Sequence, residues 1–476
     1  MKKIFLFAIS LILASCKAQK PVTTAGNLIK QFEKTPVLHD AHYGISVREI
    51  KTGKEIISQN SLANLAPASN LKLLYTLAAY DKFGKDFHFK TKLFYSGKIN
   101  NGTLYGDLIF QPDGDPTFAA LRFNEDLDSL LQSIVKVIKS KGIRQIKGKL
   151  KMELSSWRYP APGSWPIEDV GNYYGTGAWE FNFRDNRLDV FLQRSNIEGK
   201  STKVLNTYPK IKGLKYISKV TTAASNTDDE SYVFAAPFDN VRYILGTIPA
   251  GNKPFRVKAG MPNPPLSFLK IFKDKLKKNN IEVEQIEVTY HQNGYKNLLW
   301  QKLSPSLLEI VKKTNDYSMN HYSEALGWLL INGHRPANGY MSKDSINAFF
   351  KQNYHLMHID LEDASGLAPD NILPPSDLTF YLQEMSHKLG LETLLDILPH
   401  GGKDGYAKYF LRNSKLQNRV WVKSGSVSKV RNYSGIFKGK SGKYYSFSVM
   451  TNFFIGKHKD VRKAIEKLIE GLIAIG

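Results

Sequence analysis

The spacing of apolar and polar positions changes along the chain, and each change predicts a different kind of element. Residues 43–50 alternate, a turn follows at 51–54, and 55–58 resume the alternation, which predicts a β-hairpin. Residues 69–83 then place apolar side chains three and four positions apart, as in a helix with one face in the core. The folded part therefore opens with a hairpin and a long helix.

The middle of the chain, from about 90 to 288, consists of short strand-like segments separated by many glycine turns. Helical spacing returns there at 127–141 and at 265–280. We interpret this region as an insertion of two small units, one nested in the other.

Beyond about residue 300 the spacing is mainly helical, and strands return near the end. The expected helices are 307–315, 322–331, 342–353 and 377–389. The expected strands are 419–423, 433–437 and 444–451, followed by an amphipathic helix at 461–475. A hairpin, a helical block and an antiparallel sheet together predict a mixed α/β (α+β) domain that is interrupted once.

The domain boundaries are expected where these patterns change. The main domain is predicted at 27–90 and 292–476, the inserted domain at 91–155 and 252–291, and the nested inserted domain at 156–251. Two segments that are distant in the sequence therefore form the main domain.

The N-terminus has the pattern of an export signal. Lys2 and Lys3 precede the apolar residues 4–13, a run too short to span a bilayer as a mature helix. The next residues lead to Cys16, the single cysteine of the chain, and resemble the bacterial lipoprotein signal. This resemblance implies removal of 1–15, a lipid on Cys16, a tether at 16–26, and a location in the cell envelope (periplasm) with a membrane anchor.

The composition narrows the classes of function. With 476 residues, 42% of them apolar, the chain can bury a large core. The lone cysteine excludes disulfides and cysteine-based zinc sites, and the histidines show no metal-binding pattern, so we expect neither metal nor cofactor. The net charge of +23 is spread along the chain, and an exported protein meets anionic membrane or wall polymer, not nucleic acid. The oligomeric state cannot be predicted.

Ser69 and Lys72 stand one turn apart at the start of the predicted helix 69–83, so the lysine amine can reach the serine hydroxyl. The amine can act as a base if its pKa falls, and the helix start offers N–H groups to an oxyanion. Ser-x-x-Lys alone is unspecific. It also occurs at Ser133, Ser267 and Ser426. Position at a helix start favours Ser69, because Ser133 lies inside a predicted helix and Ser426 at a strand exit.

Two further short patterns fit the same chemistry. Ser-x-Asn occurs at Ser58, Ser318 and Ser345, and Lys-Ser/Thr-Gly occurs at Lys51, Lys423 and Lys440. Ser318-Met319-Asn320 falls in a polar break between two predicted helices, where side chains can point into a cleft. The Lys423 triplet follows the apolar residues 420–422, which places it at the end of a buried strand, whereas the other two triplets fall in turns.

Taken in this order, Ser-x-x-Lys, Ser-x-Asn and Lys-Ser/Thr-Gly resemble the motifs of the penicillin-binding protein and serine β-lactamase superfamily. The separation of about 250 residues between the first two resembles the class C low-molecular-mass penicillin-binding proteins, the D-alanyl-D-alanine carboxypeptidase/endopeptidase family (peptidase family S13). Similar stretches also occur at 67–74, 168–175, 318–325 and 363–367.

The resemblance implies a transpeptidase-like domain that acts on peptidoglycan stem peptides and binds β-lactams covalently. It implies that Ser69 attacks the carbonyl of the penultimate D-alanine, that Lys72 takes the proton, and that Ser318 relays a proton to the leaving D-alanine. The implied substrate-binding residues are Asn320, Lys423, Ser424, Gly425 and Ser426. The backbone N–H groups of Ser69 and Ser426 would form the oxyanion hole.

Two residues depart from the usual family pattern. Ser424 stands where threonine is common, which keeps the hydroxyl, and Met319 stands where asparagine or aspartate is common. We expect Met319 to point away from the chemistry. Glu168, Asp169 and Arg184 are candidates for contacts with a charged end of the stem peptide. Two alternatives remain open: a β-lactamase, and a wall-binding module of the same fold with weak or no turnover.

Overall fold

The computed structural model describes residues 24–157, 159–291, 294, 297–333 and 341–476. The predicted signal peptide and Cys16 lie outside these residues. Helix α1 (Ala25–Glu33) begins inside the expected tether, and the Thr24 hydroxyl accepts a hydrogen bond from the backbone of its first turn. Among the described residues, no helix combines the length and the apolar character that crossing a bilayer requires.

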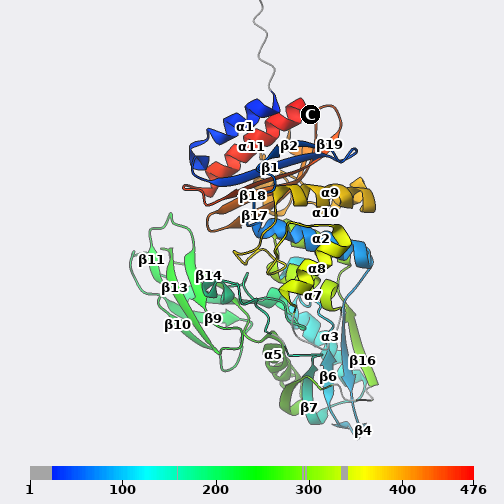
Figure 1. Cartoon of the computed structure of the whole chain (residues 1–476). Helices are drawn as coiled ribbons and strands as arrows, with labels where there is room; N and C mark the ends of the chain where they lie inside the picture. The colour runs from blue at the N-terminus through cyan, green and yellow to red at the C-terminus, as the bar shows by residue number, and fades with distance from the viewer. Residues whose placement is uncertain (1–23, 158, 292–293, 295–296, 334–340) are drawn as a thin grey trace, which may run out of the picture.

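A five-stranded antiparallel sheet in the order β17-β18-β19-β1-β2 forms the centre of the main domain (Figure 1). Its strands are β1 (His42–Glu49), β2 (Glu55–Gln59), β17 (Val420–Val427), β18 (Val430–Lys438) and β19 (Tyr444–Asn452). Strand β17 runs four residues past Lys423, so the sequence-based expectation that this lysine ends the strand is wrong. Residues 424–427 continue the ladder, although serine and glycine fill its first three positions, because their backbone groups pair with β18.

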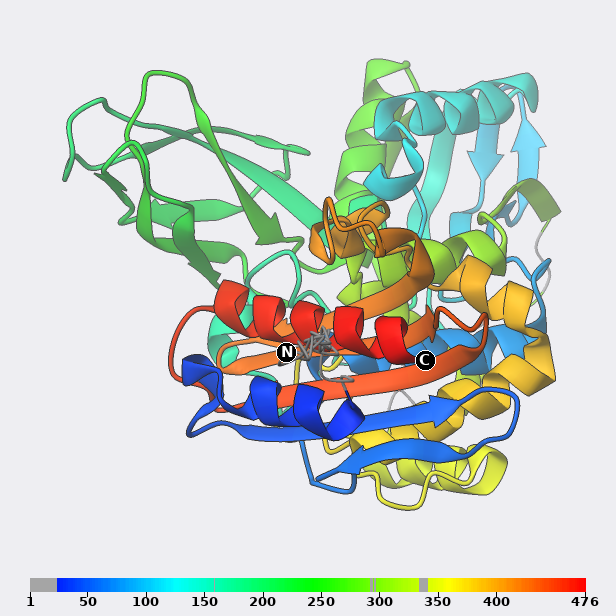
Figure 2. The same ribbon diagram turned by 90° about the horizontal axis from the view of Figure 1, so that it is seen from above.

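Helices cover both faces of this sheet. Helices α1 and α11 (His458–Ile475) lie side by side across one face, where they pack on Ile45 and Val47 (Figure 2). Side chains alternate along a strand, so Ser46 turns to the opposite face. There its hydroxyl lies 2.7 Å from the Thr379 hydroxyl of α9 (Pro375–Leu389).

A helical block continues the main domain below α9 (Figure 1). It contains α2 (Lys72–Phe83), α6 (Leu307–Tyr317), α7 (Asn320–Asn332), α8 (Lys343–Tyr354) and α10 (Leu391–Ile397). The helix expected at 69–83 is divided into a 3₁₀ turn, η2 (Ala68–Leu71), and α2. All residues from 72 to 79 of α2 are buried, so a lysine at the start of this helix is removed from water.

The insertion is built on a seven-stranded mixed sheet in the order β16-β3-β6-β7-β5-β4, with β15 also paired to β7. Its strands are β3 (Lys90–Tyr95), β4 (Lys98–Asn100), β5 (Thr103–Tyr105), β6 (Leu108–Gln111), β7 (Gln145–Glu153), β15 (Glu282–Thr289) and β16 (Asn297–Leu303). Helices α3 (Leu127–Ser140) and α5 (Pro264–Lys278) supply much of its core. Strand β16 pairs antiparallel with β3, so the chain enters and leaves the insertion on neighbouring strands.

A second lobe projects from this sheet (Figure 1). Its strands are β8 (Arg187–Gln193), β9 (Lys203–Tyr208), β10 (Lys215–Ser218), β11 (Thr221–Ala223), β12 (Glu230–Phe234), β13 (Val241–Pro249) and β14 (Phe255–Gly260). They form a three-stranded sheet, β14-β8-β9, and a four-stranded sheet centred on β13. The short helix α4 (Ile167–Val170) contacts β12.

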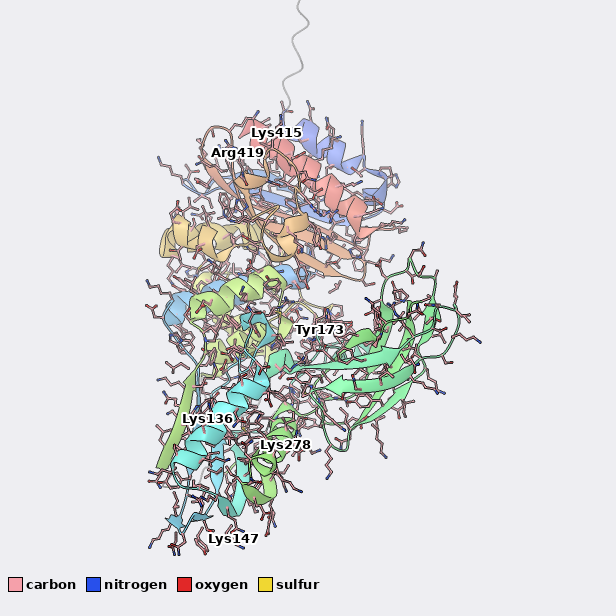
Figure 3. All side chains as sticks on the ribbon, turned by 180° about the vertical axis from the view of Figure 1, so that it is seen from behind. Lys136, Lys147, Tyr173, Lys278, Lys415 and Arg419 are labelled. Carbon is pink, nitrogen blue, oxygen red and sulfur yellow. The ribbon has the colours of Figure 1, made fainter. Side chains whose placement is uncertain are left out.

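Basic side chains are distributed over the whole molecule (Figure 3). Lys136, Lys147 and Lys278 lie toward the far end of the insertion, whereas Lys415 and Arg419 lie at the opposite end, near the main sheet. The net charge of +23 therefore does not gather in one basic face.

Candidate active site

Ser69 lies in the 3₁₀ turn η2, directly before α2. Residues three apart eclipse one another in a 3₁₀ turn, so the side chain of Lys72 stands over Ser69. The Lys72 ammonium nitrogen, Nζ, lies 2.9 Å from Ser69 Oγ, and it also donates to the backbone carbonyl of Ser365. The pairing expected from the spacing of these two residues is present.

The environment of Lys72 favours the neutral amine. The side chain is completely buried, and this burial lowers the pKa of Lys72 to about 7 from an ordinary value near 10.5, although the carboxyl groups of Asp363 and Glu324 oppose the shift. Burial raises the pKa of Glu324 to about 8, with the Asp363 charge adding to the shift. A large part of Lys72 is therefore unprotonated at neutral pH and can accept a proton from Ser69.

Asp363 organises the loop that faces Lys72. Its buried carboxylate accepts hydrogen bonds from six groups of the protein. The donors are the Trp165 indole, the Ser365 hydroxyl, the Asn371 amide and the backbone N–H groups of Gly366, Leu367 and Ala368, at 2.8 to 3.1 Å. This network fixes the Ser365 carbonyl that Lys72 contacts, and Trp165 connects it to the insertion.

Ser318 and Lys423 form a second serine–lysine pair. Ser318 caps the end of α6 in the left-handed conformation, with φ 54° and ψ 48°, and this turn separates α6 from α7. Lys423 Nζ donates to Ser318 Oγ at 3.0 Å and to the Ser424 carbonyl at 2.7 Å. Burial places the pKa of Lys423 well below its ordinary value, and the charges of Lys72 and Arg431 act in the same direction.

Close packing between β17 and η2 sets the distance between the two pairs. A Cβ atom at Gly425 would lie 2.6 Å from the Pro67 carbonyl oxygen and 3.0 Å from Asn70 Oδ1. Only glycine therefore lets β17 approach the turn that carries Ser69. Asn70 Nδ2 also donates to Ser434 Oγ of β18 at 2.6 Å, which ties the same turn to the sheet.

These elements meet at a cleft of about 570 Å³ between the main domain and the insertion. Of the residues selected from the sequence, Ser69, Ser318, Asn320 and Ser426 line the cleft. The side chains of Lys72 and Lys423 are buried behind it, and Asn320 Nδ2 donates to the Tyr174 carbonyl at 2.9 Å. Residues from distant parts of the sequence therefore assemble around Ser69.

Only some of the remaining candidates chosen from the sequence line the cleft. Glu168 and Asp169 line the cleft, whereas Arg184 is buried and donates to Asp189 at 2.7 Å, so Arg184 is not available to a substrate there. Met319 packs against an aromatic and aliphatic cluster and also lines the cleft. Ser133 is exposed on α3, does not line the cleft, and donates to the Leu130 carbonyl.

Several contributors were not found by sequence reasoning. The carboxyl of Glu324 and the network around Asp363 lie behind Lys72, although both segments carried a family resemblance. His458 Nδ1 lies 3.2 Å from Ser426 Oγ, and no local pattern marks this histidine. Arg122 and Lys258, from separate parts of the insertion, also line the cleft. The alternation of apolar and charged residues in β14 could have marked Lys258, whereas Arg122 lies in a short 3₁₀ turn that carries no such pattern.

The active-site serine class of penicillin-binding enzymes is defined by a serine with a buried lysine and by a second serine–lysine pair. These groups lie beside a glycine-containing edge strand of a sheet that helices cover, and this protein has the same arrangement. Profile comparison gives the same result for nearly the whole chain. The chain belongs to the D-Ala-D-Ala carboxypeptidase 3 (S13) family, whose profile matches residues 24–473.

Individual relatives agree with this assignment. The chain is 24% identical over 452 residues to a D-alanyl-D-alanine carboxypeptidase of Haemophilus influenzae, covering 94% of this chain and 92% of the relative. The crystal structure of penicillin-binding protein 4 from the same organism matches the fold with a TM-score of 0.80 at 22% identity, covering 95% of this chain and 100% of the other. A further crystal structure of that protein, complexed with a β-lactam, matches with a TM-score of 0.75 at 23% identity, covering 93% and 98%.

Proposed function

We propose that this protein is a serine-type D-Ala-D-Ala carboxypeptidase, D,D-endopeptidase or both, which cleaves peptidoglycan stem peptides through an acyl-enzyme on Ser69. The observation that carries the proposal is the contact of 2.9 Å between Ser69 Oγ and Lys72 Nζ, in a site where burial lowers the pKa of Lys72 to about 7. A serine hydroxyl is a weak nucleophile, and a neutral amine at this distance can remove its proton during attack.

In the acylation step, Ser69 Oγ attacks the carbonyl carbon of the penultimate D-alanine while Lys72 Nζ takes the hydroxyl proton. The backbone N–H groups of Ser69 and Ser426 stabilise the resulting oxyanion. Asn320 holds the substrate amide. Lys423 and Ser424 of β17 bind the carboxylate next to the scissile bond, the lysine through its charge and the serine through its hydroxyl.

In the next step, the C–N bond breaks and the leaving amine takes a proton from Ser318 Oγ. Ser318 regains a proton from Lys423 Nζ, which lies 3.0 Å away, and Lys423 in turn regains one from Lys72, which returns to the neutral amine. Water then attacks the ester carbonyl while Lys72 takes a proton from it; the bond between the acyl carbon and Ser69 Oγ breaks, Lys72 returns the proton to Ser69 Oγ, and the shortened peptide leaves with a new carboxylate. Ser318 therefore connects the two lysines during one turnover.

Covalent labelling with a fluorescent penicillin tests the nucleophile. The wild type should be labelled and Ser69→Ala should not be. Ser133→Ala is the matched control, because Ser133 belongs to the same short pattern but is exposed on α3. Labelling of Ser69→Ala, or a folded wild type that takes no label, would exclude the proposed mechanism and leave the wall-binding module.

Digestion of muropeptides tests the substrate. Uncross-linked pentapeptides should release D-alanine, and cross-linked dimers should give monomers. A folded enzyme that is labelled by penicillin but hydrolyses neither substrate would refute the hydrolase function. Rapid loss of the penicillin label, at a rate that matches hydrolysis of the drug, would favour a β-lactamase.

We also propose that the mature protein is a lipoprotein of the cell envelope, anchored through Cys16. The support is the position of the single cysteine directly after a short apolar run that follows two lysines. In fractionated cells the wild type should sediment with membranes, and Cys16→Ser should become soluble once its signal peptide is removed. A Cys16→Ser protein that has lost its signal peptide and still sediments with membranes like the wild type would refute the anchor.

A further inference from the structure

The ribbon formed by β8 and β14 has one apolar face and one charged face. Its apolar side chains enter the core of the insertion. They are Leu188, Val190, Leu192, Val257 and Ala259, each at most 2% exposed. The opposite face carries the charged residues of the two strands. They are Arg187, Asp189, Arg256 and Lys258, with Lys258 directly across from Asp189.

This charged face has more cations than anions. Asp189 is shared by Arg187 at 2.6 Å, Arg184 at 2.7 Å and Arg256 at 3.9 Å. Lys258 has no carboxylate oxygen within 4.0 Å in the part of the chain that the structure describes. Its pKa is lowered by partial burial and by the neighbouring arginine charges, which agrees with an excess of positive charge.

Two cations of the charged face turn toward the cleft that contains Ser69, whereas Arg256 is half exposed and does not line it. Arg187 and Lys258 both line this cleft. The Lys258 ammonium lies 5.2 Å from the centre of the Tyr173 ring, and Tyr173 lies where the ribbon lobe meets the helical block (Figure 3). The cations of the insertion therefore face the same space as the nucleophile.

A third cation extends this surface to the second serine–lysine pair. Arg122, in the 3₁₀ turn η3 (Leu121–Phe123), also lines the cleft, and its guanidinium stacks on the Tyr317 ring at 4.1 Å. Tyr317 directly precedes Ser318, which contacts Lys423. This is the side of the site from which the leaving amine departs in the proposed mechanism.

The other carboxylates of this region do not cancel the three cations. Asp185 is buried and accepts a hydrogen bond from the Tyr322 hydroxyl at 2.7 Å. Asp169 accepts from the Tyr174 hydroxyl at 2.9 Å, and it and Glu168, both in α4, also line the cleft, where the three cations outnumber these two carboxylates. Asp229 lies in an exposed turn before β12. The wall formed by Arg122, Arg187 and Lys258 thus remains net positive toward the cleft.

We propose that Arg122, Arg187 and Lys258 form a subsite for carboxylates of the departing peptide, so that the enzyme favours cross-linked substrates whose leaving half is a second, acidic stem peptide. The inference rests on the proposed function and specifies its substrate. A free D-alanine has a single carboxylate, which Lys423 and Ser424 bind, so it has no group that could bind to Arg122, Arg187 and Lys258. A departing stem peptide has further carboxylates that extend beyond the scissile bond and can reach the wall.

Two synthetic cross-linked peptides isolate the contribution of charge. Both have the same acyl half and a free carboxylate next to the scissile bond, but the other carboxylates of the departing half are free in one and amidated in the other. The wild type should cleave the acidic peptide with the higher kcat/KM, and the ratio should fall as salt is added. Lys258→Met should lower this ratio about fivefold, the size expected for one partly screened charge pair.

The ratio is measured within each variant, so a loss of folded enzyme cancels. Arg256→Gln is the matched control, since Arg256 lies on the same strand face but does not line the cleft, and its ratio should equal that of the wild type. Arg122→Gln should lower the ratio in the same way as Lys258→Met. Equal kcat/KM for the two peptides, or a ratio unchanged in both variants, would overturn the subsite while penicillin labelling and muropeptide cleavage still support the proposed function. Failure to cleave either peptide would refute both.

Discussion

Titration of Lys72 gives the sharpest prediction about this site. If neutral Lys72 is the base for Ser69, the rate of acylation must follow the deprotonated fraction of that amine, which increases with pH. With a pKa of about 7, the deprotonated fraction is about 9% at pH 6, about 50% at pH 7 and about 91% at pH 8. The second-order rate constant for acylation should therefore increase about tenfold between pH 6 and pH 8 and bend over near pH 7.

An unshifted lysine would behave differently. With the ordinary pKa of 10.5, the neutral fraction at pH 7 is about one in three thousand, and it increases about a hundredfold from pH 6 to pH 8 without levelling. Burial of Lys72 thus raises the amount of base at neutral pH by about three orders of magnitude. The pH at which the acylation rate stops increasing therefore distinguishes a lysine with a lowered pKa from an unshifted one.

The assay is stopped-flow or quenched acylation by a fluorescent penicillin, under pseudo-first-order conditions, at constant ionic strength. Lys72→Arg is the control, because its guanidinium stays protonated at every pH used, and its acylation should fall by about a hundredfold or more. A rate that increases tenfold for each pH unit up to pH 9, or a rate independent of pH between 6 and 8, would refute the role of a buried neutral lysine.

Three other variants test the surroundings of this pair. Burial raises the pKa of Glu324 to about 8, so most of this carboxyl group is neutral near pH 7; Glu324→Gln should therefore move the bend of the pH profile only slightly, toward lower pH, and a move to higher pH would contradict the assignment. Gly425→Ala would place a methyl group 2.6 Å from the Pro67 carbonyl oxygen, so β17 must move away from η2; acylation by the protein that remains folded should fall about a hundredfold, and unchanged acylation would contradict the role of this close packing. Asp363→Ala leaves several buried donors unpaired and should lower the free energy of unfolding by about 3 kcal/mol or more in urea titration, whereas Asp370→Ala, at an exposed position, should change it by less than about 0.5 kcal/mol.

Local patterns were sufficient to predict the elements that carry the site. The spacing at 69–83 predicted that Ser69 and Lys72 meet, and they do, although a 3₁₀ turn and a helix share the segment. The break at Ser318 and the turn at Lys440 were also predicted, because a polar interruption between two apolar runs is visible without knowledge of the fold. Family resemblance then selected one set among repeated short patterns.

Contacts between distant segments could not be predicted in this way. Trp165 and Asp363 are 198 positions apart, and nothing in either segment indicates that an indole nitrogen will reach that carboxylate. Lys423 was placed at the end of its strand because polar residues follow it. Those residues continue the strand since their N–H and carbonyl groups pair with β18, which a pattern of side chains does not reveal. Arg122 and Lys258 were not associated with the cleft because they, too, reach it only through contacts between distant segments.

The pairing of β16 with β3 has a consequence for the order in which this protein folds. The main domain needs both of its segments, and joining residue 90 to residue 303 through a disordered chain of this length costs about 5 kcal/mol in loop-closure entropy. An insertion that has already folded holds these two residues opposite each other as a strand pair, so it removes that cost before Ser69 and Ser318 have to meet. During synthesis the insertion is also complete before the segment that carries Ser318 is available. The insertion therefore acts as a folding template for the domain that surrounds it, in addition to supplying one wall of the cleft.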